Sequence, residues 1–323
     1  MTQQRRADGS LRHLLTLEGL TRTELEVLLE RSQHFVRHSG AAPARSDVLH
    51  GVTIANIFTE PSTRTRVSFE LAAKRLGADV VNLELQLSSR VKGESMLDTV
   101  FTLEALHVDV FVLRDAEVGV PGMVADHVAP HVSVLSAGEA HLSHPTQGLL
   151  DALTVLQRKG RCDGLSIAIV GDIRHSRVAR SACHAFQTLG VRDLRIIAPA
   201  ALMPDDHEFA GCARSSDIAQ GIAGCDVVMM LRIQKERFAN TDIPAGDDYF
   251  REFGLTAARL ARARPDAIVM HPQPMNRGVE IESAVADGPQ SAIRLQVANG
   301  VAVRMAALEV LTAPLASRHG RRT

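Results

Sequence analysis

Residues 58–70 read FTEPSTRTRVSFE, and an apolar run at residues 52–57 stands directly before them. The run predicts a buried strand because it is short, continuous and bounded by turn residues. Behind the quoted stretch, apolar side chains recur at helical spacing up to a glycine that predicts the helix end: Val67, Leu71, Ala72, Leu76 and Gly77. The predicted order is therefore a strand, a tight turn and the N-terminus of a helix.

The predicted start of this helix carries hydroxyl and guanidinium groups and no carboxylate: Ser62, Thr63, Arg64, Thr65 and Arg66. Basic residues oppose the helix macrodipole there by about 0.3 to 1 kcal/mol each. An anion on the free backbone N–H groups removes that penalty and uses the hydroxyls as well, so we interpret the turn as a phosphate-binding site. The alternative is an ordinary N-cap at Ser62 or Thr63 with solvated arginines.

The composition is that of a globular protein with more than one domain. A chain of 323 residues suggests two domains, each with its own core. A net charge of -1 favours neither nucleic acid nor an anionic membrane as a partner. No apolar run approaches the roughly 20 residues that span a bilayer, and the polar start is not a signal peptide. The cysteines have no Cys-x-x-Cys spacing, so reduced thiols in the cytoplasm are expected: Cys162, Cys183, Cys212 and Cys225.

Strands and helices are predicted to alternate along the chain, which favours parallel sheets with helices on both faces. After the first strand, further strands are predicted at residues 78–83, 109–113, 132–135 and 165–170, at a run ending at 197, and at residues 226–231 and 267–270. We expect two doubly wound α/β domains, residues 1–147 and residues 148–291. Residues 292–323 are expected to pack back onto the first domain.

Two predicted helices frame these domains. The first spans residues 21–38, with Thr21 as its cap. It has three leucines on one face: Leu25, Leu28 and Leu29. The last spans residues 291–311 and is expected to return to the first domain. Its apolar stripe consists of Ile293, Val297, Val301, Met305 and Leu308.

Unusual polar residues follow the predicted strand ends: Ser62, Arg114, Arg177, Arg232 and His271. In open parallel sheets, ligands bind beyond the carboxyl ends of strands, so these residues are expected to share a cleft between the two domains. For any one arginine alone, a helix cap or a surface charge is the alternative. A dinucleotide site at Gly171-Asp172 is rejected because the glycine fingerprint of such sites is absent.

His144 precedes Pro145, which stands at the expected first position of a helix. Gln147 lies three residues beyond the histidine, so both side chains can face one site from the first turn of that helix. A capping or surface role for His144 is the alternative.

The string Ser62-Thr63-Arg64-Thr65-Arg66 resembles the carbamoyl-phosphate signature of the aspartate and ornithine carbamoyltransferases. Further motifs follow in the order of that family over almost the whole chain. The resemblance implies transfer of a carbamoyl group from carbamoyl phosphate to an amine, with no metal and no other cofactor. Catalysis of this kind relies on positioning and preorganised charge.

The resemblance also implies a role for each matching residue. The phosphate is held by Ser62, Thr63, Arg64 and Thr65, and charge on the breaking bond is stabilised by Arg64. The groups that point at the carbonyl oxygen are Thr65, Arg114 and His144, and the group at the carbamoyl nitrogen is Gln147. The carbamoyl end is bound by the backbone of Pro272, Gln273 and Pro274. The amine substrate is bound by Lys92, Arg177, Arg232 and Gln234.

The identity of the amine follows from charge. Arg177 and Arg232, with Gln234, supply two cationic forks for a diacid and would repel a diamino acid. The late motif His271-Pro272-Gln273-Pro274 has no Cys, which ornithine enzymes usually carry there. The sequence therefore favours L-aspartate, with N-carbamoyl-L-aspartate as the product, in de novo pyrimidine biosynthesis. The alternatives are a carbamoyltransferase of the ornithine type and a catalytically silent scaffold.

A homotrimer is implied as well, because Ser88 and Lys92 are spaced as in the loop by which family members reach a neighbouring subunit's site. Further assembly with a regulatory chain or a dihydroorotase-like partner stays open.

Two departures from the family pattern stand beside the site. Asp115 is expected to neutralise Arg114 in part, and Gln273 replaces an apolar residue where only the backbone is expected to act.

Overall fold

The computed structural model describes residues 4–37, 40–84, 95–205, 207–233 and 246–316. The chain forms two compact units. Unit 1 comprises Met1–Leu149 and Asn299–Thr323, and unit 2 comprises Leu150–Ala298.

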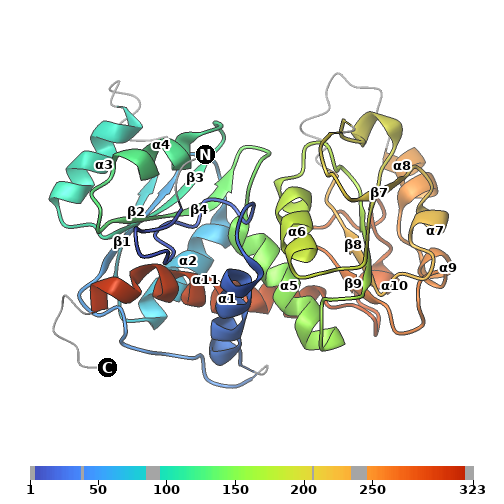
Figure 1. The fold of residues 1–323 in the computed structure, drawn as a ribbon. Coiled ribbons are helices and arrows are strands. Elements are labelled where there is room, and N and C mark those ends of the chain that lie inside the picture. The colour runs from blue at the N-terminus through green and yellow to red at the C-terminus, as the bar shows by residue number, and fades with distance from the viewer. Residues whose placement is uncertain (1–3, 38–39, 85–94, 206, 234–245, 317–323) are drawn as a thin grey trace. The chain divides into compact units, whose positions relative to one another are not determined.

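Unit 1 is built on a four-stranded sheet of order β2-β1-β3-β4, in which every strand pair is parallel. The strands are β1 Thr53–Phe58, β2 Asp79–Glu84, β3 Val110–Asp115 and β4 Ser133–Glu139. The helices of this part of the chain are α1 Arg22–Phe35, α2 Thr63–Arg75, α3 Met96–Ala105, α4 Val120–His127 and the unit 1 portions of α5 Pro145–Lys159 and α11 Ile293–Ala316. Figure 1 shows α3 and α4 on one face of the sheet and α2 and α11 on the other.

Unit 2 is built on a five-stranded parallel sheet of order β7-β6-β5-β8-β9. The strands are β5 Ser166–Val170, β6 Asp193–Ile197, β7 Ala213–Ser215, β8 Val227–Met230 and β9 Ile268–Met270. The helical segments are α6 Arg177–Thr188, the 3₁₀ turn η2 Ala200–Leu202, α7 Ile218–Gly221, α8 Gly246–Phe253, α9 Ala257–Leu260 and α10 Ser283–Ala286. The predicted fold class, two parallel-sheet α/β domains, is confirmed.

Strand order places a switch point in the middle of each sheet. In unit 1 the chain moves from β1 to β2 on one side and then to β3 on the other side. In unit 2 it moves from β5 to β6 and then back past β5 to β8. A crevice forms at the carboxyl ends of the two strands where such a sheet reverses direction, and ligands bind there. The relevant strand pairs are therefore β1 with β3 and β5 with β8.

Helix starts follow the capping signals in the sequence. The Thr21 hydroxyl accepts a hydrogen bond from the Glu24 N–H at 3.2 Å, and the Glu24 carboxylate accepts one from the Thr21 N–H at 2.7 Å. This capping box begins α1 where it was predicted, although α1 ends at Phe35 rather than at residue 38. A second capping box, made by Ser95 and Asp98, begins α3.

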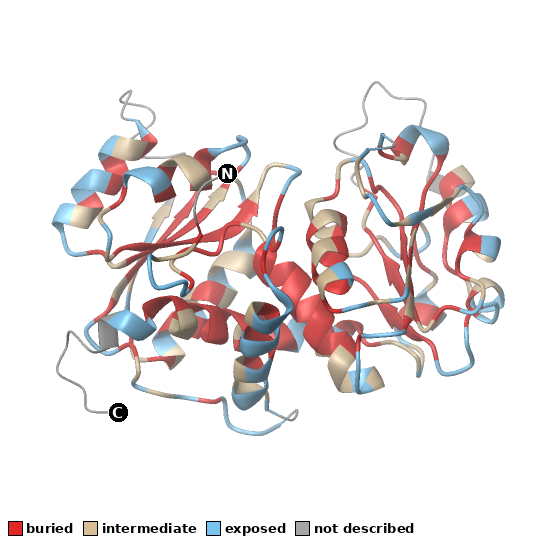
Figure 2. Cartoon of the chain, in the orientation of Figure 1, coloured by how far each residue is buried: buried red, intermediate tan, exposed pale blue. Residues whose placement is uncertain are grey.

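Some predicted inward positions are wrong. Val67 and Leu71 of α2 are 43% and 40% exposed, and Val297 of α11 is 52% exposed. The buried residues of α2 are Ala72, which the spacing included, and Phe69 and Ala73, which it did not. Figure 2 shows that the helices carry both buried and exposed residues, whereas the central strands are mostly buried. Helical spacing alone is satisfied by several overlapping stripes, and contact with the sheet decides which of them is buried.

Gly171, directly after β5, brings this strand close to the residue after β8. Its φ is +136°, and a Cβ at this position would lie 2.9 Å from the Leu231 Cβ and 3.0 Å from the Leu231 carbonyl oxygen. Glycine is required here for both reasons. The tight approach fixes the switch point of unit 2.

We expect Gly171→Ala to lower the free energy of unfolding by about 2 to 4 kcal/mol, because the methyl group meets both an unfavourable φ and a steric clash. Gly164→Ala is the matched control, since its φ is +71° but nothing lies within 4 Å of the added Cβ. The control should lose only about 1 to 2 kcal/mol. Urea-unfolding curves of both variants measure the difference, and equal losses would show that the approach to Leu231 costs nothing.

Candidate active site

The turn between β1 and α2 has the features of an anion site. Ser62 is the N-cap of α2, yet its side chain makes no capping hydrogen bond. The first turn of α2 contains no acidic residue, and its first backbone N–H groups have no acceptor within the helix. Thr63 and Arg64 are exposed, and Thr65 is half-buried. The ordinary N-cap alternative is therefore not what Ser62 adopts, and hydroxyls, N–H groups and a guanidinium converge at one helix end.

Arg114 lies in β3 beside the end of β1, since Phe58 and Arg114 are register partners. Its Nε is 2.6 Å from Glu60 Oε1, and its Nη1 is 3.4 Å from the Ala137 carbonyl oxygen. The carboxylate paired with Arg114 in this geometry is thus that of Glu60, from the turn itself. Asp115, expected from the sequence to neutralise Arg114, accepts a hydrogen bond from the Glu117 N–H at 2.9 Å. The Glu60 pair holds the guanidinium at the β1/β3 switch point.

His144 and Gln147 stand at the start of α5, which begins at Pro145 as predicted. Both side chains are buried, with 5% and 8% of their surface exposed. The Gln147 N–H donates to the His144 carbonyl oxygen at 2.9 Å, which closes the first turn. A solvated surface histidine is therefore excluded, and the segment that carries both residues follows β4, next to β3 in the sheet.

Arg304 of α11 is a residue that the sequence-based interpretation missed. It is only 5% exposed, its Nη1 donates to the Ser68 hydroxyl of α2 at 2.8 Å, and its guanidinium carbon lies 4.9 Å from the centre of the Phe69 ring. No carboxylate among the described residues forms an ion pair with it. Burial, together with the charge of Arg114, lowers the pKa of Arg304 to about 10, so the group stays charged at neutral pH.

A buried cation of this kind is unusual. Arginine is almost never fully buried without a paired anion. The sequence did contain a signal, because Arg304 lies three residues after Val301 and four before Leu308, on the stripe expected to be apolar. An arginine on a predicted core face therefore indicates a candidate site residue.

In unit 2, two arginines stand at the switch point between β5 and β8. Arg177 is the first residue of α6, whose N-cap Ser176 accepts a hydrogen bond from the Ala179 N–H at 3.0 Å. Arg232 follows β8 and is half-buried. Strands β5 and β8 are paired up to their carboxyl ends, from Ile167 with Val227 to Val170 with Met230. The two arginines therefore extend from neighbouring strand ends of one sheet.

The turn after β9 is held by a fully buried histidine. His271 Nδ1 accepts a hydrogen bond from the Gln273 N–H at 2.9 Å, and His271 Nε2 lies 3.2 Å from Glu280 Oε1. Because Nδ1 is the acceptor, Nε2 carries the proton and donates to Glu280. Gln273 has φ +62°, and the Gln273–Pro274 peptide bond is cis. The histidine thus fixes the backbone that was predicted to bind the carbamoyl end.

Glu280 was also missed from the sequence, since it lies nine residues beyond the histidine that it contacts. It accepts a further hydrogen bond from the Asn276 N–H and is fully buried. Together with burial and the charge of Asp172, it raises the pKa of Tyr249, which keeps that phenol neutral. The carboxylate therefore orients the turn after β9.

Three predicted site residues, Ser88, Lys92 and Gln234, lie outside the described residues.

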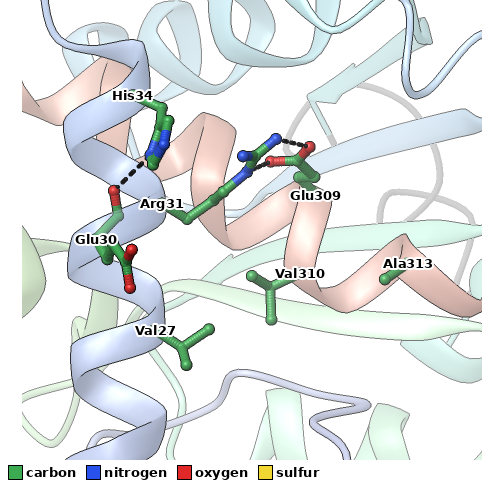
Figure 3. A pocket seen from close by; sticks show the side chains of 7 residues that line it. All are labelled: Val27, Glu30, Arg31, His34, Glu309, Val310 and Ala313. Atoms are coloured by element: carbon green, nitrogen blue, oxygen red, sulfur yellow. Dashed lines mark hydrogen bonds and ion pairs between the residues drawn. The ribbon is translucent and has the colours of Figure 1, made fainter. Parts of the chain in front are cut away.

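Two hollows in the described part of the chain do not include any predicted site residue. The hollow between α1 and α11 measures about 500 Å³, and Figure 3 shows Arg31 paired with Glu309 and His34 bonded to the Glu30 carbonyl on its wall. No helix of the described residues has both the length and the apolar character needed to cross a bilayer.

Two family models match the chain over most of its length. Residues 12–157 match the carbamoyl-phosphate-binding domain of aspartate/ornithine carbamoyltransferases, and residues 163–311 match the Asp/Orn-binding domain of the same enzymes. The chain belongs to the aspartate/ornithine carbamoyltransferase family.

Solved structures of both enzyme types resemble this chain. Aspartate transcarbamoylase from Trypanosoma cruzi in complex with carbamoyl phosphate and aspartate is 32% identical, with a TM-score of 0.80, covering 92% of this chain and 95% of that one. Ornithine carbamoyltransferase from Pyrococcus furiosus is 29% identical, with a TM-score of 0.82, covering 94% and 97%. Ornithine carbamoyltransferase from Thermus thermophilus is 25% identical, with a TM-score of 0.82, covering 93% and 99%. Overall similarity does not separate the two substrate classes.

Proposed function

We propose that this chain transfers the carbamoyl group of carbamoyl phosphate to the α-amine of L-aspartate. The observation that carries the choice of aspartate is the pair of guanidinium groups, Arg177 and Arg232, at neighbouring strand ends of unit 2. Two cationic forks match the two carboxylates of aspartate, whereas the side-chain ammonium of ornithine would be repelled. Gln234 and Lys92 complete the proposed aspartate site.

In unit 1, the proposed carbamoyl phosphate lies on the first turn of α2. Ser62, Thr63, Arg64 and Thr65 donate hydrogen bonds to the phosphate. The carbonyl oxygen, which becomes negative as the amine attacks, is stabilised by Thr65, Arg114 and His144, because donors fixed beforehand need no reorganisation. Gln147 and the backbone of Pro272, Gln273 and Pro274 orient the carbamoyl nitrogen.

Arg304 belongs to the phosphate half of this proposal. It is a second buried cation near Arg114, whose own guanidinium is paired with Glu60. A dianionic phosphate beside α2 would compensate the charge of Arg304. We assign Arg304 the role of raising the positive potential beneath the phosphate while it anchors Ser68 through a hydrogen bond.

The wider setting follows from the same proposal. N-carbamoyl-L-aspartate is the product, and de novo pyrimidine biosynthesis is the pathway in which it is used. A cytoplasmic homotrimer is the proposed assembly, with Ser88 and Lys92 of each chain reaching the site of a neighbour. A regulatory chain or a dihydroorotase-like partner is compatible with this assembly.

The second candidate function is ornithine carbamoyl transfer, favoured by the similarity to the Pyrococcus and Thermus enzymes. We expect carbamoyl phosphate with aspartate to give rapid phosphate release and N-carbamoyl-aspartate, and with ornithine or acetylornithine only background release. Mass spectrometry of the products identifies the amine acceptor. Citrulline as the main product would establish the ornithine activity instead, and no turnover with any amine would support the silent scaffold.

A further inference from the structure

Two cysteines of unit 2 lie close together, and neither has a role in the proposed carbamoyl transfer. Cys183 is on the inner side of α6 and is 3% exposed, and Cys212 is half-buried in the turn that leads into β7. Their sulfur atoms are 3.8 Å apart, as free thiols. They are 29 positions apart in the sequence, so the chain brings them together only through the packing of α6 on the sheet.

The surroundings of Cys212 favour its thiolate. The two sulfurs lie within hydrogen-bond distance at 3.8 Å, and the Gln187 side-chain amide donates to Cys212 Sγ at 3.7 Å. The pKa of Cys212 is lowered, with the hydrogen bond to Cys183 as the largest cause; the charge of Arg214 lowers it further, whereas burial opposes the shift. The same hydrogen bond and complete burial raise the pKa of Cys183. Cys212 is therefore the sulfur favoured as the nucleophile, and Cys183 stays protonated until it reacts with Cys212.

We propose that Cys212 and Cys183 form a reversible disulfide when the protein meets a peroxide, with Cys212 as the attacking and Cys183 as the resolving thiol. The Cys212 thiolate attacks one peroxide oxygen, the O–O bond breaks, and hydroxide leaves, giving a sulfenic acid. Cys183 then loses its proton and attacks the Cys212 sulfur, the S–O bond breaks, and the second oxygen leaves as water. Two thiols and one hydrogen peroxide thus give one disulfide and two waters.

The geometry of the turn supports this motion. Bond formation brings the two sulfurs from 3.8 Å to about 2 Å. The turn that carries Cys212 has two residues with positive φ, Phe209 at 55° and Gly211 at 81°, and it precedes β7, an edge strand paired only with β6. Arg180 of α6 stacks over the Phe209 ring at 5.2 Å, which keeps the turn against the helix that holds Cys183. The approach therefore needs an adjustment at an edge and no repacking of the central strands.

The chain supplies its own controls. Cys162 and Cys225 are also free, and they are buried, with 3% and 0% of their surface exposed. Burial raises the pKa of Cys225 to about 11, which removes its thiolate at neutral pH. These two thiols should survive oxidant exposure that converts the proposed pair.

The test uses the reduced full-length chain and a small excess of hydrogen peroxide at neutral pH. Of the four free thiols, two should disappear, and peptide mapping without reductant should find residue 183 joined to residue 212. Dithiothreitol should restore all four. Cys225→Ser should form the same bridge, Cys212→Ser should leave Cys183 as a thiol, and Cys183→Ser should stop at a Cys212 sulfenic acid that dimedone traps.

Three results would overturn the inference. The first is a wild-type chain that keeps all four thiols under conditions that oxidise free cysteine. The second is a sulfenic acid at Cys212 that accumulates in the wild type without a bridge. The third is loss of Cys162 or Cys225 at the same rate as Cys212, which would show global unfolding rather than a local reaction. None of these outcomes depends on the carbamoyl-transfer proposal.

Discussion

Arg64→Ala is expected to lower kcat by about 10² to 10³-fold while leaving the fold intact. Arg64 is exposed on the first turn of α2, so truncating it removes little packing. In the proposed reaction, however, its guanidinium meets the charge that develops as the bond to phosphate breaks. Steady-state kinetics with carbamoyl phosphate and aspartate give the loss, and circular dichroism with thermal unfolding tests the fold.

Lys74→Ala is the matched control, since Lys74 is exposed in the last turn of the same helix and pairs with half-buried Glu70. It should retain nearly full activity. Near-normal turnover of Arg64→Ala would refute the proposed role of the α2 turn. The same variant tests the shared sites: mixed trimers of Arg64→Ala and Lys92→Ala chains should recover activity, because some of their sites contain neither substitution.

Arg304→Met is expected to raise the KM for carbamoyl phosphate and the inhibition constant of inorganic phosphate by about 10- to 100-fold, the range for a lost interaction with a charged group. The methionine keeps much of the volume, and replacing a buried charge by an apolar side chain is often neutral for stability. The effect should therefore appear in phosphate binding and not in the unfolding temperature. Kinetics over both substrate concentrations and calorimetric phosphate binding measure it.

Two further substitutions separate charge from anchoring. Arg304→Lys keeps a positive charge and should recover part of the phosphate affinity. Ser68→Ala removes the one hydrogen bond that Arg304 donates to α2 and should change phosphate binding by less than threefold, since the cation stays. If Arg304→Met lowers thermal stability with phosphate affinity unchanged, Arg304 is a structural tie between α11 and α2 and nothing more.

The fold class was predictable because its signals are local. A run such as residues 52–57, followed by a turn and a helical period, specifies one strand and one helix without reference to the rest of the chain. The capping pair at Thr21 and Glu24 set a helix start for the same reason. The buried faces of α2 and α11 were less predictable, because burial depends on how each helix lies on its sheet.

The site residues also differ in how well a single sequence predicts them. Ser62, Thr63, Arg64 and Thr65 form one continuous string with a recognisable chemical pattern, so a single sequence points to them. The partners that position a site come from distant segments: Glu60 reaches Arg114 across 54 positions, and Arg304 reaches Ser68 across 236. No local period encodes such pairs, and only the folded chain brings them together.

The discontinuity of unit 1 has a consequence for biosynthesis. Unit 2 is one uninterrupted stretch of chain, whereas Asn299–Thr323 of unit 1, which includes Arg304, is synthesised only after the whole of unit 2. Unit 2 can therefore complete its sheet during translation. The N-terminal part of unit 1 therefore stays without α11 until that helix has been synthesised.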